Sequence, residues 1–301
     1  MTTYTETLHA GGFITGELPD LLSRKTGSLA SGQNLLAGAV LGKITKAIAA
    51  APIPTIVGTG TGLMSALTFG PDVQTGSYVI TLTATSATAA FSVTAPDGTV
   101  LPTGNVATAY TSSHLSFLIA NGGTMTTGDV FTVVVTAGGT PVLVGTGSGV
   151  VSAFTLGPLA QNGTYRVTVL ATSATGEFEV IAPDGGKLKR GQIATAYASD
   201  HVNFTLANGG TMTVADYFNI IVAKGSGKIV EFTPTTYDGR HTPYGVLHGA
   251  VDATAGDADG VVLARGPALI REDDLTWATA VTSAQKASAL TKLAAAGIVS
   301  R

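Results

Sequence analysis

The run ANGGTMT occupies residues 120–126 and recurs without a change at residues 207–213. Three shorter runs repeat at the same offset of 87 positions: VGTG at 57–60 and 144–147, APDG at 95–98 and 182–185, and ATAY at 107–110 and 194–197. The offset holds without a gap from Val57 to near Ala137, and about half of the aligned positions are identical. Repetition at one constant spacing indicates tandem copies of a single structural unit.

Both copies alternate short strand candidates with tight turns. In the first copy, YVITLT at 78–83 alternates and is rich in β-branched side chains, which favour strands. The intervening turns carry Pro96-Asp97-Gly98 and Asn121-Gly122-Gly123, where proline presets φ and asparagine and glycine accept positive φ. Each copy is therefore expected to be a small β-sandwich-like domain. The further strand candidates of the first copy are 91–93, 115–119 and 130–135.

The positions that are identical in the two copies are largely turn and aromatic residues, whereas the positions that change include charged residues. Charge changes at positions expected to face outward, because Ala90 becomes Glu177 and Pro102-Thr103 becomes Lys189-Arg190. A constant scaffold under a variable surface is typical of a spacer or display module rather than of a shared active site. The constant aromatic residues are Tyr78, Phe91, Tyr110, Phe117 and Phe131.

The composition of the 301 residues fits a mainly β fold and argues against several functions. Charged residues make up 12 %, about half the ~25 % of an average globular protein, and hydrophobic residues make up 45 %. The net charge is −3 and no basic stripe is visible, so no nucleic-acid partner is expected. The absence of cysteine excludes disulfides and thiolate chemistry. No apolar run approaches the ~20 residues of a membrane span, and no signal peptide is recognised, so no membrane partner is expected.

The remaining sequence lies on both sides of the repeats. AGAVLGKIT at 37–45 predicts a strand and KIVEF at 228–232 predicts its partner. The repeats are therefore expected to be inserted at the tip of a hairpin, where an insertion costs little. A helix near the C-terminus is expected to be capped by Thr282 or Ser283 and ended by Gly297. Its predicted apolar stripe consists of Ala287, Leu290, Leu293 and Ala294, and the preceding strand candidates are 245–251, 260–264 and 268–270.

Three runs outside the repeats, taken in order, match a known pattern. They are AGAVLGKIT at 37–45, GVLHGAVD at 245–252 and IREDDLTW at 270–277, and the apolar pair Ile298-Val299 agrees with them. The sequence thereby resembles the head decoration proteins of tailed bacteriophages, the lambda-type capsid-cementing proteins. The resemblance covers about 125 residues in two parts. The tandem insertion is a departure from the small members of the family.

The resemblance implies a structural virion protein, made in the host cytoplasm, that binds the major capsid protein on the outer surface of the expanded head. It implies a homotrimer that cements the capsid. The insertion at a hairpin adds the expectation that the repeats project outward. The expected fold class is mainly β: a small decoration domain with a short C-terminal helix, interrupted by two tandem β-sandwich-like repeat domains. The expected divisions are a capsid-binding arm at 1–31, a discontinuous domain at 32–52 and 225–301, a first repeat at 53–140 and a second repeat at 141–224.

The resemblance also implies where contacts are made. An arm that adds strand pairing to a capsid needs extended polar chain with occasional apolar anchors. The expected capsid-contacting residues of the arm are Phe13, Ile14, Leu18, Leu21, Leu22, Arg24 and Lys25. The acidic run before the only tryptophan is expected near a trimer or capsid interface, and its residues are Glu272, Asp273, Asp274 and Trp277.

No catalytic, metal-binding or cofactor-binding residue is predicted, and the chain is not expected to be an enzyme. GTGTG at 58–62 and GSGK at 225–228 lack the spacing and ending of a phosphate-binding loop. Asp252, Asp257 and Asp259 lack the glycine and glutamate of a calcium-binding loop, so a solvated turn is expected there.

One pair of histidines is shared by the repeats, and it leads to no catalytic prediction. His114 and His201 are equivalent, but Ser113 becomes Asp200, so no catalytic partner is kept beside them. The alternative function is adhesion, in which immunoglobulin-like repeats on a virion bind glycans or a cell surface. A spacer role and weak glycan contact are compatible with each other.

Overall fold

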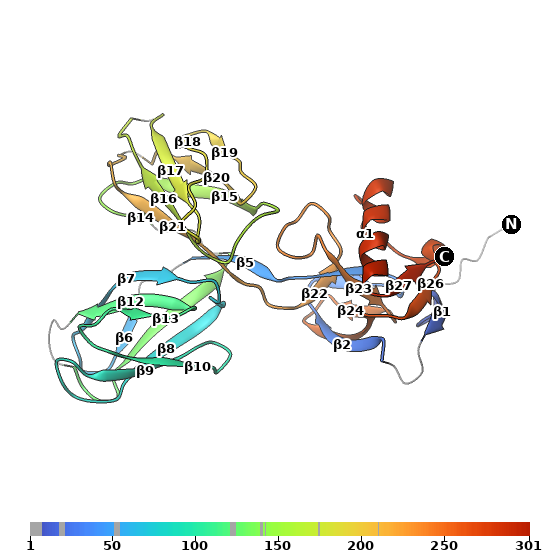
Figure 1. The fold of residues 1–301 in the computed structure, drawn as a ribbon, viewed down its shortest axis with the longest axis horizontal. Coiled ribbons are helices and arrows are strands. Elements are labelled where there is room, and N and C mark those ends of the chain that lie inside the picture. Colours follow the sequence, from blue (N-terminus) through green and yellow to red (C-terminus); the bar gives the residue numbers. More distant parts are fainter. Residues whose placement is uncertain are drawn as a thin grey trace. The chain divides into compact units, whose positions relative to one another are not determined.

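The computed structural model describes residues 8–17, 22–50, 55–120, 125–138, 141, 143–173, 175–209 and 211–301 (Figure 1). The fold is mainly β with an α-helix near the C-terminus, as the sequence predicted. The chain divides into two compact units. The split unit consists of Met1–Thr45 and Ser226–Arg301, and the repeat unit consists of Lys46–Gly225.

Five strands of the split unit close into a barrel. β4 (Val40–Lys43) pairs antiparallel with β22 (Ile229–Glu231), with Lys43 opposite Ile229, so the predicted partner strand is confirmed. The interior is filled by branched aliphatic side chains, which suit a pleated surface. The other strands are β2 (Arg24–Leu29), β23 (Pro243–Leu247) and β25 (Ala258–Leu263). The buried residues at the centre are Leu29, Leu41, Ile229, Leu247 and Val262.

A second core lies between the barrel and a small sheet in the order β1-β26-β27. This sheet consists of β1 (Ile14–Glu17), β26 (Ala268–Ile270) and β27 (Ile298–Ser300). One more pair, β3 (Gln33–Leu35) with β24 (Val251–Ala253), completes the strands of the split unit. The largest buried side chains of the second core include Phe13, Phe232, Ile270 and Leu293.

Helix α1 (Ser283–Ala295) packs against β23 and β27. Thr282 caps it as predicted: the Thr282 hydroxyl accepts from the Gln285 N–H, and the Gln285 side chain accepts from the Thr282 N–H, which is a capping box. The predicted stripe is partly wrong, because Ala287 and Ala294 are exposed. Leu293 of the predicted stripe is buried, and so is Ala289 one helical turn before it, which was not predicted. Their face is the one directed at the two strands.

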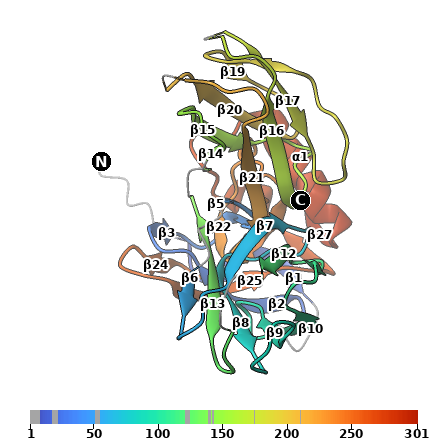
Figure 2. The ribbon, with the colours of Figure 1, turned by 90° about the vertical axis from the view of Figure 1, so that its left-hand side faces the viewer.

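The repeat unit contains two sets of strands that follow the same order (Figure 2). In each set, five strands belong to one sheet and the other three form a second sheet. The first set is β6 (Thr55–Val57), β7 (Leu63–Phe69), β8 (Gly76–Leu82), β9 (Ala90–Thr94), β10 (Val100–Asn105), β11 (Tyr110–Thr111), β12 (Leu115–Ala120) and β13 (Val130–Ala137). The second set is β14 (Leu143–Val144), β15 (Val150–Leu156), β16 (Gly163–Val169), β17 (Glu177–Ile181), β18 (Gly191–Gln192), β19 (Ala196–Tyr197), β20 (Val202–Ala207) and β21 (Tyr217–Lys224).

The aromatic residues that both copies share are core residues. Phe91, Tyr110 and Phe117 pack ring against ring, with centroids 4.8–5.6 Å apart. Phe178, Tyr197 and Phe204 form the same cluster in the second copy. Aromatic packing of this kind contributes beyond the area that it buries.

The strand β5 (Lys46–Ala50) joins the two copies into one continuous sheet. β5 pairs antiparallel with β13 of the first copy and with β21 of the second. The sequence placed residues 46–50 in the discontinuous domain, whose first part was expected to end at residue 52. The structure ends that part at Thr45, because the backbone groups of β5 are hydrogen-bonded to the repeats.

A buried carboxylate explains why VGTG is identical in both copies. Asp129 is 3 % exposed and accepts hydrogen bonds from the N–H groups of Thr59 at 2.9 Å and Thr126 at 3.0 Å. Asp216 takes the same position in the second copy. Gly58 has φ +142°, and a Cβ there would lie 2.0 Å from the Asp129 carboxylate. Only glycine therefore lets the loop approach the carboxylate this closely.

Replacing Asp129 by asparagine should destabilise the repeat unit by about 1–3 kcal/mol, because an amide nitrogen cannot accept from a buried N–H. Urea unfolding followed by far-UV circular dichroism measures the loss. The matched control is Asp97→Asn, an exposed turn residue that accepts from the Thr99 N–H. Equal losses in the two variants would contradict the structural role of Asp129.

Candidate capsid-binding surface

The described N-terminal segment runs along the split unit. Phe13 is fully buried, and its carbonyl accepts from the Arg271 N–H at 2.8 Å. Ile14 begins β1 and lies opposite Ile270 of β26. Both predicted anchors are therefore packed inside this chain's own fold, and Phe13 presents no side-chain surface to a partner.

Arg24 is also engaged within the split unit. It lies on β2 and forms a bidentate salt bridge with Glu17, in which Nε donates to Oε1 at 2.8 Å and Nη2 donates to Oε2 at 2.5 Å. The Ser23 hydroxyl donates to the same carboxylate. The hydrogen bond from Arg24 holds the pKa of Glu17 below its usual range. Lys25, next along the strand, is exposed.

These contacts change the extent of the predicted arm. Every residue from Arg24 to Leu29 has a partner on β25, so this stretch is a barrel strand and not a free arm. The reason is tertiary: β2 closes the barrel, and without it β25 would lose one of its two neighbouring strands. Leu22 precedes the strand and is 56 % exposed, and Leu18 and Leu21 lie outside the described residues.

The acidic run forms a short 3₁₀ turn, η2 (Glu272–Asp274), directly after β26. Glu272 and Asp273 are exposed, while Asp274 faces Arg271 with 3.5 Å between Oδ2 and Nη1. The turn lies against Gly38, which has φ +82°, and a Cβ there would be 2.5 Å from the Asp274 carbonyl. The same Cβ would be 3.1 Å from Leu8, so the first described residue lies beside the acidic turn.

Trp277 is half-buried beside the turn and has two defined contacts. Its ring meets Phe232 edge to face, with centroids 6.1 Å apart. The Lys286 ammonium lies 5.8 Å from the ring centroid, within the range of a cation–π contact. Trp277 therefore ties the turn to α1 and to the second core while keeping part of its ring accessible.

One apolar hollow was not predicted as a site. It has a volume of about 300 Å³ on the outer side of the small sheet, and Leu269 and Val299 line it together with Gly16, Pro267 and Gly297. Val299 is 43 % exposed. The signal in the sequence was the apolar pair Ile298-Val299, in which Ile298 is buried and its neighbour must face the other way because side chains alternate along a strand.

The split unit thus presents exposed carboxylates, a half-buried tryptophan and an apolar hollow. Within the described ranges, no three His, Asp or Glu side chains come together in a group that could hold a metal ion. Nor does any helix in that part of the chain have the length and apolar character needed to cross a membrane. The arrangement is one that can contact another protein.

Comparison with known protein families supports the resemblance that the three sequence runs indicated. The family model of the bacteriophage lambda head decoration protein D matches residues 3–298. The chain belongs to this family. Head decoration proteins are structural virion proteins of the outer capsid surface, so the partner of this chain is the phage capsid. No curated protein and no solved structure matches the chain.

Replacing Phe13 by alanine should destabilise the split unit by about 3–5 kcal/mol, because it empties a fully buried aromatic site. Unfolding can be followed by the fluorescence of Trp277, the only tryptophan in the chain. Leu22→Ala is the matched control at an exposed apolar residue and should change stability little. A stable Phe13→Ala protein that no longer binds phage heads would instead identify Phe13 as a capsid anchor.

Proposed function

We propose that this protein cements the expanded head as a homotrimer, with the split unit on the capsid and the repeats projecting outward. The observation that carries the proposal is the family match over residues 3–298, which spans the split unit and the insertion together. A trimer binds through three copies of one surface, so modest contacts per subunit add up to firm attachment.

The contacts that we assign to the capsid or trimer interface lie on the split unit. Glu272 and Asp273 are free to meet basic groups of a neighbour, because both are exposed and only Asp274 faces Arg271. Leu269 and Val299 offer apolar area in the same unit. β1 and β27 are the edge strands of the small sheet and could accept an added strand. Capsid binding by the arm is now proposed for the residues before Leu8.

The outward position of the repeats is supported by how the chain leaves and re-enters the split unit. The Ile44 N–H donates to the Lys228 carbonyl at 2.9 Å, and the Gly227 N–H donates to the Ile44 carbonyl at 2.9 Å. The two ends of the insertion are thus held side by side. A domain inserted through adjacent strand ends leaves the remaining surface of its host free for other contacts.

Mixing the purified protein with expanded, undecorated heads should give saturable binding with three copies at each threefold position, visible by electron microscopy. Deletion of residues 1–7 should weaken binding strongly while Trp277 fluorescence and unfolding stay unchanged. Deletion of residues 1–31 should instead unfold the split unit, because it removes β1 and β2. Absence of saturable binding by the full-length protein would refute the cementing role, and full binding after the short deletion would refute the arm.

Replacement of residues 46–225 by a two-residue Asn-Gly turn should leave head binding intact, because the paired ends at Ile44 and Gly227 need only a short connection. The binding assay above measures this, with the full chain as control. Lost head binding in the shortened protein would mean that the repeats take part in attachment.

The alternative adhesive function is tested with residues 46–225 on a glycan array, where an array without binding is expected for a spacer.

A further inference from the structure

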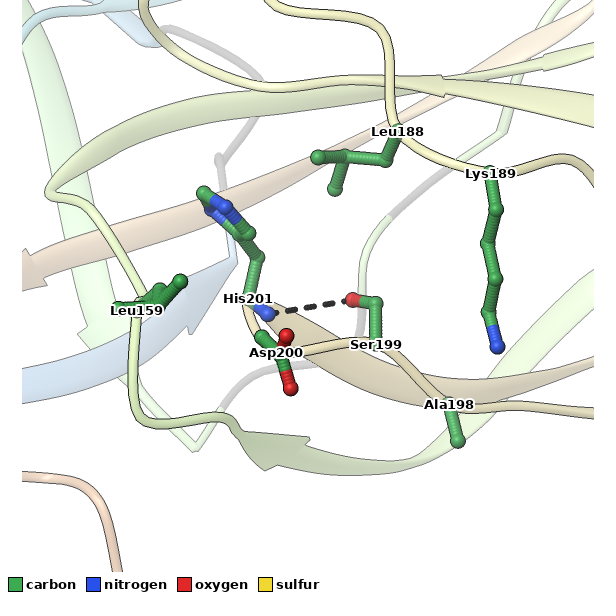
Figure 3. A pocket seen from close by; sticks show the side chains of 7 residues that line it. All are labelled: Leu159, Leu188, Lys189, Ala198, Ser199, Asp200 and His201. Atoms are coloured by element: carbon green, nitrogen blue, oxygen red, sulfur yellow. Dashed lines mark hydrogen bonds between the residues drawn. The ribbon is translucent and has the colours of Figure 1, made fainter.

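A groove of about 520 Å³ opens on the second repeat, between the loop after β15, the loop before β20 and the segment that joins β17 to β18 (Figure 3). Figure 3 shows Leu159 and Leu188 on opposite sides of the groove, with Asp200 and His201 between them. The complete lining is Leu159, Leu188, Lys189, Ala198, Ser199, Asp200 and His201.

The same pair of loops exists in the first repeat, which allows a comparison within one chain. There, the Asp72 N–H donates to the Ser113 carbonyl at 2.9 Å. In the second repeat, the Leu159 N–H donates to the Asp200 carbonyl at 2.7 Å. Asp72 corresponds to Leu159, and Ser113 corresponds to Asp200. Each copy thus keeps one carboxylate in this hydrogen-bonded pair, but on opposite loops. The acid was exchanged between the two positions and not lost.

In the first repeat this carboxylate holds a lysine from an extended segment of the chain itself. The Lys224 ammonium lies 2.9 Å from Asp72 Oδ1, and the Lys224 N–H donates to the Val73 carbonyl at 2.7 Å. Lys224 also forms a parallel bridge with Gln74. The hydrogen bond from Lys224 lowers the pKa of Asp72, as expected for a paired carboxylate.

In the second repeat the backbone carbonyl of the corresponding place is already occupied, and only the carboxylate is available to an incoming segment. Leu159 is 60 % exposed, and none of the described Lys or Arg side chains forms an ion pair with Asp200. The carbonyl of Ala160, which corresponds to that of Val73, accepts from the Lys46 ammonium. An incoming segment would therefore bind through its side chain at Asp200 and through apolar contact with Leu159.

We propose that this groove docks an extended peptide segment of a partner protein that presents a lysine or arginine side chain to Asp200. The first repeat provides the template, since its equivalent loops already hold such a segment around Lys224. Charge complementarity supports the same occupant at one end of the groove, where the Asp200 carboxylate is exposed, and the Lys189 ammonium in the lining confines this complementarity to the surroundings of Asp200.

A peptide fits this groove better than a saccharide does. Sugar rings usually stack on an accessible aromatic face, and the only ring in the lining is that of His201. His201 is held by Tyr165, with 3.1 Å between Nδ1 and the phenolic oxygen, and the two rings meet edge to face. Affinity for a single segment is expected to be weak, because an exposed ion pair contributes little. Display of several copies on one particle would compensate for this.

The test is an NMR titration of the ¹⁵N-labelled full chain with a capped peptide of sequence VAKGSG, which copies residues 222–227. The amide signals of Leu159, Asp200 and His201 should shift with a millimolar dissociation constant. The same peptide with glutamine in place of lysine should shift them far less. Lys224→Gln is the positive control, because it removes the ammonium that pairs with Asp72 and should add shifts at Asp72.

Two variants separate the proposal from a general effect on folding. Asp200→Asn should weaken peptide binding about two- to fivefold, the range of an exposed ion pair. Leu159→Asp installs the carboxylate of the first repeat and should strengthen binding by a similar factor, a gain that misfolding cannot produce. The proposal would be overturned by an absence of shifts at the groove, by equal shifts with the glutamine peptide, or by unchanged affinity in both variants. It would also be overturned if neutral and acidic saccharides shifted the signals of the groove and the peptide did not.

Discussion

The antiparallel pairing of β4 with β22 is the interaction on which the rest of this structure depends. It joins strands that lie on opposite sides of the whole insertion, and it places Lys43 opposite Ile229. The barrel of the split unit cannot close without it, because β22 lies between β2 and β4 in the strand order. The cost of bringing such distant segments together grows only slowly with the length between them. The insertion also folds as a compact unit of its own, so its length adds no large loop to be ordered.

The duplication shows which features the repeat fold requires. The buried carboxylates Asp129 and Asp216 and the glycines beside them are kept, because an added Cβ would enter the space of the carboxylate. The aromatic clusters are kept because both sheets pack against them. Outward residues are under no such constraint, so the second copy could acquire ion pairs such as Arg190 with Glu177 without disturbing the core.

The same freedom explains why two copies of one fold can present different surfaces. The exchange of the acid between Asp72 and Asp200 changes what each groove can hold, but it leaves the backbone pairing of the loops intact. The carboxylate of the first groove is paired with Lys224 of the chain, whereas Asp200 forms no ion pair with a described Lys or Arg side chain. Function on such a scaffold resides in a few side chains at the loop ends, which is the usual relation between a fold and its sites.

Much of the fold followed from the sequence alone, because repeats, turn residues and strand alternation are local signals. The order of three short runs likewise identified the decoration family before any contact was known. The helix cap is another local feature, and Thr282 is one of the two residues predicted for it. Only the tertiary structure decided that Arg24–Leu29 closes a barrel, that Phe13 is buried and that β5 belongs to the repeats. Each of these features depends on a strand or core residue from a distant part of the chain. The sequence of a segment does not tell whether its partner lies within the same molecule or on another one, because the same polar and apolar residues suit both.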